Sequence, residues 1–152
     1  MGARTTAREA ALQMLFALEA GNGSADQVIA DFWRETPGDA EGRAYADELV
    51  RSIARDLEAT DGLIRAASRN WRLERMTRVD RNVLRLGAWE LAHRRDVPRP
   101  VILDEAVEVA KRFGTEESGA FVNGVLDRIA DDCGRTEGEG LPELDGGDQG
   151  PS

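Results

Sequence analysis

The chain has 152 residues, carries a formal net charge of −9, and contains 32% charged but only 5% aromatic residues. This length suits one domain with a hydrophobic core, and the abundance of Ala, Leu, Arg and Glu favours a soluble helical protein. The apolar runs are too short to span a bilayer, no signal-peptide core opens the chain, and Cys133 is the only cysteine. The sequence therefore predicts a cytoplasmic protein with no membrane contact and no disulfide framework.

The negative charge is unevenly distributed along the chain. Residues 131–152 hold seven acidic residues and one arginine, whereas residues 62–112 hold twelve basic and seven acidic residues. Binding of a polyanion responds to the local electrostatic field more than to the net charge. A locally basic surface is therefore compatible with this acidic protein.

Two capping patterns mark the first helices. The first predicted helix runs from about Ala7 to Ala20, and Thr6 before it and Glu9 in its first turn have the spacing of a capping box. Ser24 and Gln27 repeat this spacing and predict the start of a short second helix.

The middle of the chain reads as three further helices. A long helix is predicted from about Asp39 to Ala59, after a Pro-Gly break, and a fourth segment begins at Thr60. Thr77 predicts the start of the fifth helix, because its side chain can cap the first turn, and Asp80 is favourable at the third position.

The last two predicted helices follow the rigid connector Asp96-Val-Pro98-Arg-Pro100. The sixth helix covers about Leu103 to Phe113 and ends at a glycine. Thr115 is expected to cap the seventh helix, which contains the stretch FVNGVLDRIA at residues 121–130.

These segments define the expected fold class. No strand alternation and no fixed-period repeat is visible, so residues 1–132 are predicted to form an all-α, compact single-domain bundle of about seven helices. Residues 133–152 are rich in Gly, Glu and Asp and offer few apolar side chains for burial. This acidic tail is therefore predicted to be disordered.

Asn123-Gly124 lies inside the apolar pattern of the seventh predicted helix, where a glycine costs about 1 kcal/mol relative to alanine. A glycine kept at such a position usually lets a neighbouring element approach the backbone. We therefore expect a neighbouring helix against Gly124, and a loss of stability on replacement by leucine. Asn123 is expected to hydrogen-bond a neighbouring loop or helix end, or to face a ligand.

Several other side chains carry simple expectations from their type and spacing. Trp71 and Trp89 are expected in the core, where large aromatic residues are usually found. The side chains of Arg78, Arg81 and Arg85 are spaced to share one solvated helix face.

The sequence gives no sign of catalysis. It contains no phosphate-binding loop, no Gly-rich dinucleotide turn and no pair of His ligands on a helix. His93 is the only histidine, so a catalytic relay or a His metal site has no second member. We therefore expect no enzyme activity, no cofactor and no metal.

Three stretches of the chain resemble the NusB family of transcription antitermination factors: AREAALQMLFALE (7–19), NWRLERMTRVDRNVLRLGAWEL (70–91) and DVPRPVILDEAVEVAKRFGTEESGAFVNGVLDRIA (96–130). The resemblance implies a small all-helical cytoplasmic protein that pairs with NusE, the ribosomal small-subunit protein S ten. It also implies binding to the boxA element of nascent ribosomal RNA transcripts, within an RNA polymerase antitermination complex that resists termination.

The same resemblance implies an RNA-binding face built from the N-terminal basic segment and the last two helices. Single-stranded RNA is held by cations on its phosphates and by aromatic faces under its bases. The candidate RNA-binding residues are Arg4, Arg8, Lys111, Arg112, Phe121 and Asn123. The first two guanidinium groups are expected beside the Phe121 ring on one surface, and Asp80 matches an acidic position at the family's NusE interface.

Alternatives remain at each site. By spacing alone Phe121 belongs to the core stripe, Asp80 is a favourable first-turn carboxylate, and the basic residues are solvated. Thr5 and Thr6 stand where many family members have further arginines, which predicts weaker RNA binding and a shallower salt dependence.

Alternative functions also remain. One is a non-catalytic, protein-binding helical adaptor. Another is a stand-alone relative of the RNA-binding domain of RNA cytosine methyltransferases, here without a cofactor-binding domain. A homodimer that covers the RNA face is a further alternative, because some family members self-associate.

Overall fold

A computed structural model describes residues 2–140 of the chain, and this part contains seven α-helices, one short 3-10 turn and no strand. The helices are α1 (Ala3–Glu19), α2 (Ala25–Glu35), α3 (Ala40–Arg55), α4 (Leu57–Ala67), α5 (Arg78–His93), α6 (Arg99–Phe113) and α7 (Ser118–Asp132), and the 3-10 turn is η1 (Leu73–Arg75). The predicted all-α bundle of seven helices is confirmed. Within the described residues, we find no helix whose length and apolar character would let it cross a membrane.

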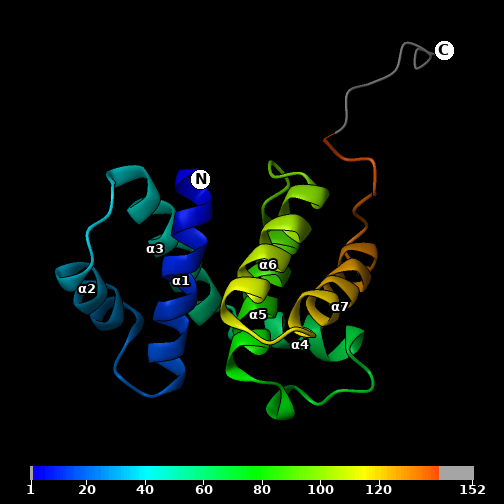
Figure 1. Ribbon diagram of the computed structural model, residues 1–152, viewed down its shortest axis with the longest axis horizontal. Helices are drawn as coiled ribbons and strands as arrows, with labels where there is room; N and C mark the ends of the chain where they lie inside the picture. Colours follow the sequence, from blue (N-terminus) through cyan, green and yellow to red (C-terminus); the bar gives the residue numbers. More distant parts are fainter. Residues whose placement is uncertain (1, 141–152) are drawn as a thin grey trace.

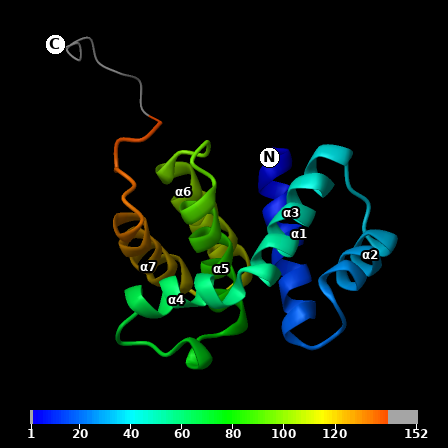
Figure 2. The same ribbon diagram turned by 180° about the vertical axis from the view of Figure 1, so that it is seen from behind.

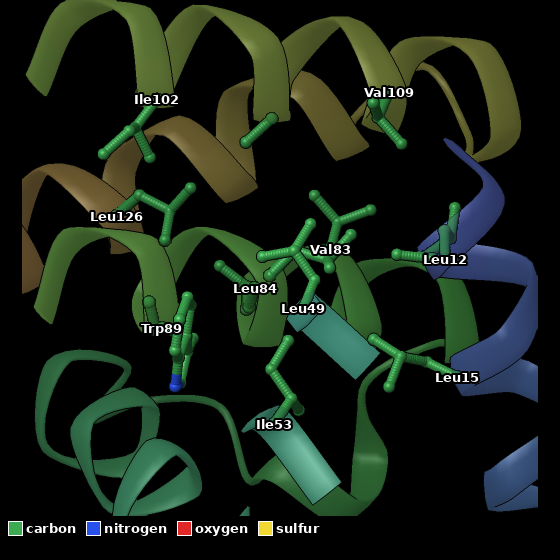
Figure 3. Close-up of a cluster of buried hydrophobic side chains, with 14 of the residues drawn as sticks. Leu12, Leu15, Leu49, Ile53, Val83, Leu84, Trp89, Ile102, Val109 and Leu126 are labelled. Atoms are coloured by element: carbon green, nitrogen blue, oxygen red, sulfur yellow. The ribbon is translucent and has the colours of Figure 1, made fainter. Parts of the chain in front are cut away.

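Helix α5 lies at the centre of the bundle. It packs against α1, α3, α4, α6 and α7, while α2 packs against α1 and α3 at the periphery (Figures 1 and 2). Figure 3 shows Val83 and Leu84 of α5 among side chains from the surrounding helices, including Leu12 of α1 and Leu49 of α3. These apolar side chains of α5 therefore lie in the core.

Close helix packing occurs at Gly87 and not at Gly124. A Cβ atom added at Gly87 would lie 2.6 Å from Cδ1 of Leu126, so the missing side chain lets α7 approach α5. A Cβ atom added at Gly124 would meet nothing within 4 Å. The expectation that a helix packs on Gly124 is therefore wrong, because that residue lies on the exposed side of α7.

Helix starts were predicted correctly where a side chain caps the helix. Ser24 and Gln27 form the predicted capping box of α2, and Thr77 accepts a hydrogen bond from the Asp80 backbone N–H at the start of α5. The predicted cap at Thr6 is wrong. Helix α1 begins at Ala3, and the Thr6 hydroxyl donates to the Gly2 carbonyl within its first turn.

The long helix predicted from Asp39 to Ala59 is divided at Asp56, where the backbone leaves helical geometry and α4 begins at Leu57. Thr60 therefore lies inside α4 and not at its start. Asp61 is buried, and its carboxylate accepts two hydrogen bonds from Arg85 of α5, at 2.8 and 3.0 Å, which compensate the burial of its charge.

The last two helices also differ from prediction at their starts. Helix α6 begins at Arg99, four residues earlier than predicted, and Pro100 is accommodated in its first turn. Helix α7 begins at Ser118, whose hydroxyl accepts a hydrogen bond from the Thr115 backbone N–H, so Thr115 is not its side-chain cap.

Residues 133–140 pack on the bundle, so the prediction that disorder begins at residue 133 is wrong for this segment. The Arg135 side chain is fully buried and donates to the carbonyls of Leu91 and Val97 at 3.1 and 2.5 Å. Its guanidinium also pairs with Glu139 at 2.6 Å. The remainder of the predicted tail, residues 141–152, lies outside the described residues.

Candidate nucleic-acid interface

An aromatic pair lies on the surface between α7 and the connector from α4 to α5. The ring centroids of Phe121 and Trp71 are 5.9 Å apart at an angle of 79°, an edge-to-face arrangement. Trp71 is 61% exposed, whereas Phe121 is half-buried and packs against the core. The expectation of a buried Trp71 is therefore wrong, while Trp89 is buried as predicted.

A turn after α4 fixes the position of Trp71. The Trp71 backbone N–H donates to the Ser68 carbonyl at 2.9 Å. The Ser68 hydroxyl donates to the Ile64 carbonyl at 2.7 Å and lies 3.3 Å from the Trp71 carbonyl. The exposed indole is thus attached to an ordered backbone.

Two surface hollows meet at this aromatic pair, and both rings line each of them. The acidic hollow is lined by Trp71, Arg75, Met76, Thr77, Asp80, Glu117 and Phe121. The basic hollow is lined by Ser68, Arg69, Asn70, Trp71, Ala120, Phe121, Gly124, Val125 and Arg128. The first contains two carboxylates, whereas no acidic residue lines the second, so the two sides of the aromatic pair differ in charge.

Unpaired arginines gather around these hollows. Thirteen of the twenty Lys and Arg residues form ion pairs with described residues. The other seven are Arg4, Arg43, Arg69, Arg75, Arg78, Arg95 and Arg128. Three of these seven line the two hollows, so positive charge that no described carboxylate neutralises is concentrated beside the aromatic pair.

Asp80 has one carboxylate oxygen without a hydrogen-bond donor among the described residues. Its Oδ1 atom is buried and unpaired, although the backbone N–H of the same residue is capped by Thr77. Buried polar atoms are usually satisfied, and a missing partner is costly. Asp80 therefore contributes to the acidic hollow a carboxylate with one oxygen that no described donor satisfies.

Arg8 was expected on the surface, and this expectation is wrong. Its side chain is 4% exposed, and Nε and Nη2 each donate to the Glu90 carboxylate at 2.9 Å. Glu105 lies 3.4 Å from Nη1, and the Tyr45 hydroxyl donates to Glu90. Burial disfavours the charged form of Arg8, but the hydrogen bond and charge of Glu90 raise its pKa above the ordinary value. Arg8 therefore links α1 to α5 and α6 and offers no free cation.

Arg4 is exposed, but it lies away from Phe121. Its guanidinium lies over the Tyr45 ring, 4.7 Å from the centroid, and Tyr45 in turn contacts Glu90. Phe121 lines a hollow with Asp80, which is ten residues and about 15 Å of helix rise from Glu90 along α5. The predicted juxtaposition of both N-terminal guanidiniums with the Phe121 ring is therefore wrong; in Figure 1 the N-terminus lies at the top and α7 begins below.

Lys111 and Arg112 end α6 as exposed cations. Lys111 packs beside the first turn of α7, because a Cβ atom added at Gly119 would lie 3.2 Å from its Cγ atom. Its amino group is 3.9 Å from Glu108, and Arg112 pairs with Glu9 of α1 at 2.9 Å. Both cations are accessible, but each has a carboxylate neighbour.

Two further expectations concern exposed polar residues. Asn123 is exposed and makes no side-chain hydrogen bond to any described residue, so the expected bond to a loop or helix end is absent. Arg81 and Arg85 do not lie on a solvated face, because both pair with Glu19, at 2.6 and 3.1 Å. Arg78 is exposed as predicted.

Comparisons with known proteins agree with this architecture. The model of the NusB family matches residues 5–131. The "Transcription antitermination protein NusB" of Sorangium cellulosum (strain So ce56) is 74% identical over 137 residues, which cover 90% of this chain and 98% of that protein. The protein of the same name from Myxococcus xanthus (strain DK1622) is 48% identical over 134 residues, covering 86% and 96%.

Solved structures show the same relationship. NusB of T. maritima superposes with a TM-score of 0.78 at 41% identity, covering 85% of this chain and 91% of that chain. One chain of a crystal structure of antitermination factors NusB and NusE in complex with dsRNA gives a TM-score of 0.79 at 27% identity, covering 87% and 98%. The family match spans most of the chain, and the bundle of α1 to α7 is shared with these structures: this protein is a member of the NusB family.

Proposed function

We propose that this protein is a transcription antitermination factor that binds boxA-type single-stranded RNA in nascent ribosomal RNA transcripts together with NusE, and so helps RNA polymerase resist termination. The observation that carries the proposal is the surface pair of Phe121 and Trp71, with a basic hollow on one side and an acidic hollow on the other. The names of the relatives, and the solved assembly of NusB and NusE with dsRNA, support a role in antitermination that involves NusE and RNA.

The RNA contact is centred on Phe121. An exposed aromatic face can stack under a base only when that base is unstacked from its neighbours, which favours single-stranded RNA. Lys111 lies beside the first turn of α7, Arg112 is one residue further on, and the Asn123 side chain makes no hydrogen bond to any described residue. Arg4 can contact only RNA that extends towards Tyr45. Arg8 joins α1 to α5 through Glu90 and does not contact RNA.

The acidic hollow is the proposed contact for NusE. Asp80 and Glu117 supply negative charge there. A basic side chain of NusE complements this charge and can donate a charge-assisted hydrogen bond to the exposed Glu117 carboxylate. With NusE on one side of the aromatic pair and RNA on the other, each ligand completes the surface that the other uses.

The protein acts through binding and performs no chemistry of its own in this proposal. His93 stacks on Trp89 at a centroid distance of 4.7 Å, and its Nδ1 atom lies 3.1 Å from the Trp89 carbonyl. Both contacts of the imidazole are packing contacts within α5. No group of three His, Cys, Asp or Glu residues within residues 2–140 is arranged to hold a metal ion.

Binding of labelled boxA RNA, measured by gel shift and by fluorescence anisotropy with and without NusE, tests the proposal. Phe121→Ala is expected to weaken RNA binding by about 5-fold or more, as the loss of one stacked base predicts. Leu57→Ala is the matched control, since Leu57 is an exposed apolar residue on α4 that lines neither hollow. If the protein bound NusE but never RNA, the adaptor alternative would replace this proposal.

A further inference from the structure

We propose that the basic hollow is a second nucleotide subsite, in which the base next to the one on Phe121 stacks on Trp71 while Arg69 and Arg128 neutralise the adjoining phosphates. The inference rests on the proposed function, because it requires RNA on the Phe121 face. It adds a binding site on the α4–α5 connector, which the sequence-based expectations did not include.

Trp71 is the first observation that supports the subsite. An indole that is 61% exposed leaves most of its apolar surface in water, although its backbone is held by the turn at Ser68. Its edge-to-face contact with Phe121 fixes the ring on one side and leaves the remainder open to the hollow. An ordered and exposed aromatic ring beside another is the arrangement on which successive unpaired bases stack.

Charge identifies the class of occupant. Arg69 and Arg128 are exposed and form no ion pair with any described residue, and Arg128 is held in place by donating to the Ala67 carbonyl at 2.9 Å. The lining residues include no carboxylate, unlike those of the acidic hollow. Two unneutralised guanidiniums beside an aromatic ring suit a phosphodiester with its base, and the hollow continues directly from Phe121.

Gly124 provides an independent third observation. It lines the basic hollow, and a Cβ atom there would meet no other atom within 4 Å, so nothing in the bundle requires a glycine. Glycine lowers helix stability relative to alanine, and it is favoured where a ligand approaches the backbone closely. An absent side chain on the floor of this hollow leaves room for the ribose-phosphate chain along α7.

The test compares three RNAs in the presence of NusE: a short boxA oligonucleotide, the same oligonucleotide with three extra nucleotides at its 5′ end, and the same oligonucleotide with three extra nucleotides at its 3′ end. Fluorescence anisotropy at fixed salt gives the Kd for each. The wild-type protein is expected to bind one extended RNA more tightly. Trp71→Ala is expected to remove this gain, about 5-fold or more, and Trp71→Phe to retain part of it.

Two further variants separate the subsite from general effects on folding. Gly124→Leu is expected to remove the same gain while its melting temperature stays at or above that of the wild type, because the new side chain meets only solvent. Arg69→Gln and Arg128→Gln are each expected to make the dependence of log K on log salt shallower by about 0.7. Arg43→Gln is the matched control, since Arg43 also lacks an ion pair with any described residue and lies over a different tryptophan, Trp33.

The outcomes distinguish this inference from the proposed function. If Phe121→Ala weakened binding of the short RNA, but Trp71→Ala and Gly124→Leu bound the extended RNA as the wild type does, the subsite would be refuted and the proposed function kept. If none of the three RNAs bound, the proposed function and the subsite would both be refuted. If Gly124→Leu, which alters the basic hollow and not the acidic one, weakened NusE binding in the absence of RNA, the basic hollow would be a protein contact and the subsite inference would be overturned.

Discussion

Arg8 of α1 and Glu90 of α5 form a buried ion pair, with Nη2 and Oε2 2.9 Å apart and at most 4% of either side chain exposed. The Tyr45 hydroxyl of α3 donates to the same carboxylate, so one acidic group joins three helices. Burial, followed by the neighbouring Glu90 charge, raises the pKa of Tyr45 above its ordinary range. The tyrosine therefore stays a neutral donor to this carboxylate.

Removing the Glu90 charge should destabilise the fold strongly. Glu90→Gln leaves the Arg8 guanidinium buried without a full counter-charge, and breaking a buried pair in this way costs about 3–5 kcal/mol. Urea unfolding followed by circular dichroism measures the loss. Arg34→Gln is the control, because its pair with Asp31 is exposed and should contribute less than about 1 kcal/mol. A Glu90→Gln variant as stable as the control would show that the buried pair contributes little to stability.

Two Gly→Ala substitutions are expected to have opposite signs. At Gly87 the new methyl group would overlap Leu126, which is fully buried, and overpacking of this kind costs about 1–3 kcal/mol. At Gly124 the methyl group meets only solvent, and the gain in helix propensity should stabilise the protein by about 0.4–1 kcal/mol. Thermal unfolding of both variants measures whether each is more or less stable than the wild type. A stabilised Gly87→Ala variant would contradict the close packing of α5 and α7.

The segment after α7 should contribute to stability through Arg135. Its buried guanidinium satisfies the carbonyls of Leu91 and Val97, and Arg135→Ala leaves these acceptors unpaired at a cost of about 1–3 kcal/mol. Arg95→Ala is the matched control, since Arg95 is exposed and donates only to the Cys133 carbonyl. Equal unfolding midpoints for the two variants would mean that residues 133–140 add nothing to the stability of the bundle.

Acid should weaken the ion pair between Arg135 and Glu139 within a defined pH range. The hydrogen bond from Arg135 lowers the pKa of Glu139 to about 2, whereas an unfolded chain has an ordinary glutamate value of about 4.3. The ionised carboxylate therefore stabilises the fold fully above pH 4.3, and this contribution is lost as the pH falls towards 2. The difference in unfolding free energy between wild type and Glu139→Gln should shrink over that range, as urea titrations at successive pH values can measure. A difference independent of pH would contradict the pairing.

Local signals in the sequence predicted much of the fold. The capping side chains of Ser24 and Thr77 marked helix starts correctly, because capping depends on residues three positions apart. The division between α3 and α4 was predicted at Thr60 and lies at Asp56, because the apolar spacing continues through Asp56 into α4. Residues 133–140 were missed because their order depends on one arginine that bonds distant carbonyls.

The candidate site was predicted only in part. Arg8 was read as a surface cation by residue type, yet it precedes Leu12 and Leu15 by four and seven positions and so lies on their apolar stripe. Glu90 likewise follows Leu86 by four positions on the stripe of α5. A cation and a carboxylate on two buried stripes are a signal for a buried pair. Trp71 lies in an irregular connector, where no periodicity reports exposure.

Tryptophan fluorescence tests most directly whether RNA binds on the surface formed by Trp71 and Phe121. Trp71 is the exposed indole, whereas Trp33 is half-buried and Trp89 is buried. Titration of boxA RNA into the protein with NusE bound should therefore quench the emission of the wild type and of Trp33→Phe. The quenching should largely disappear in Trp71→Phe. RNA that bound with unchanged affinity but quenched Trp71→Phe as strongly as the wild type would contradict this placement.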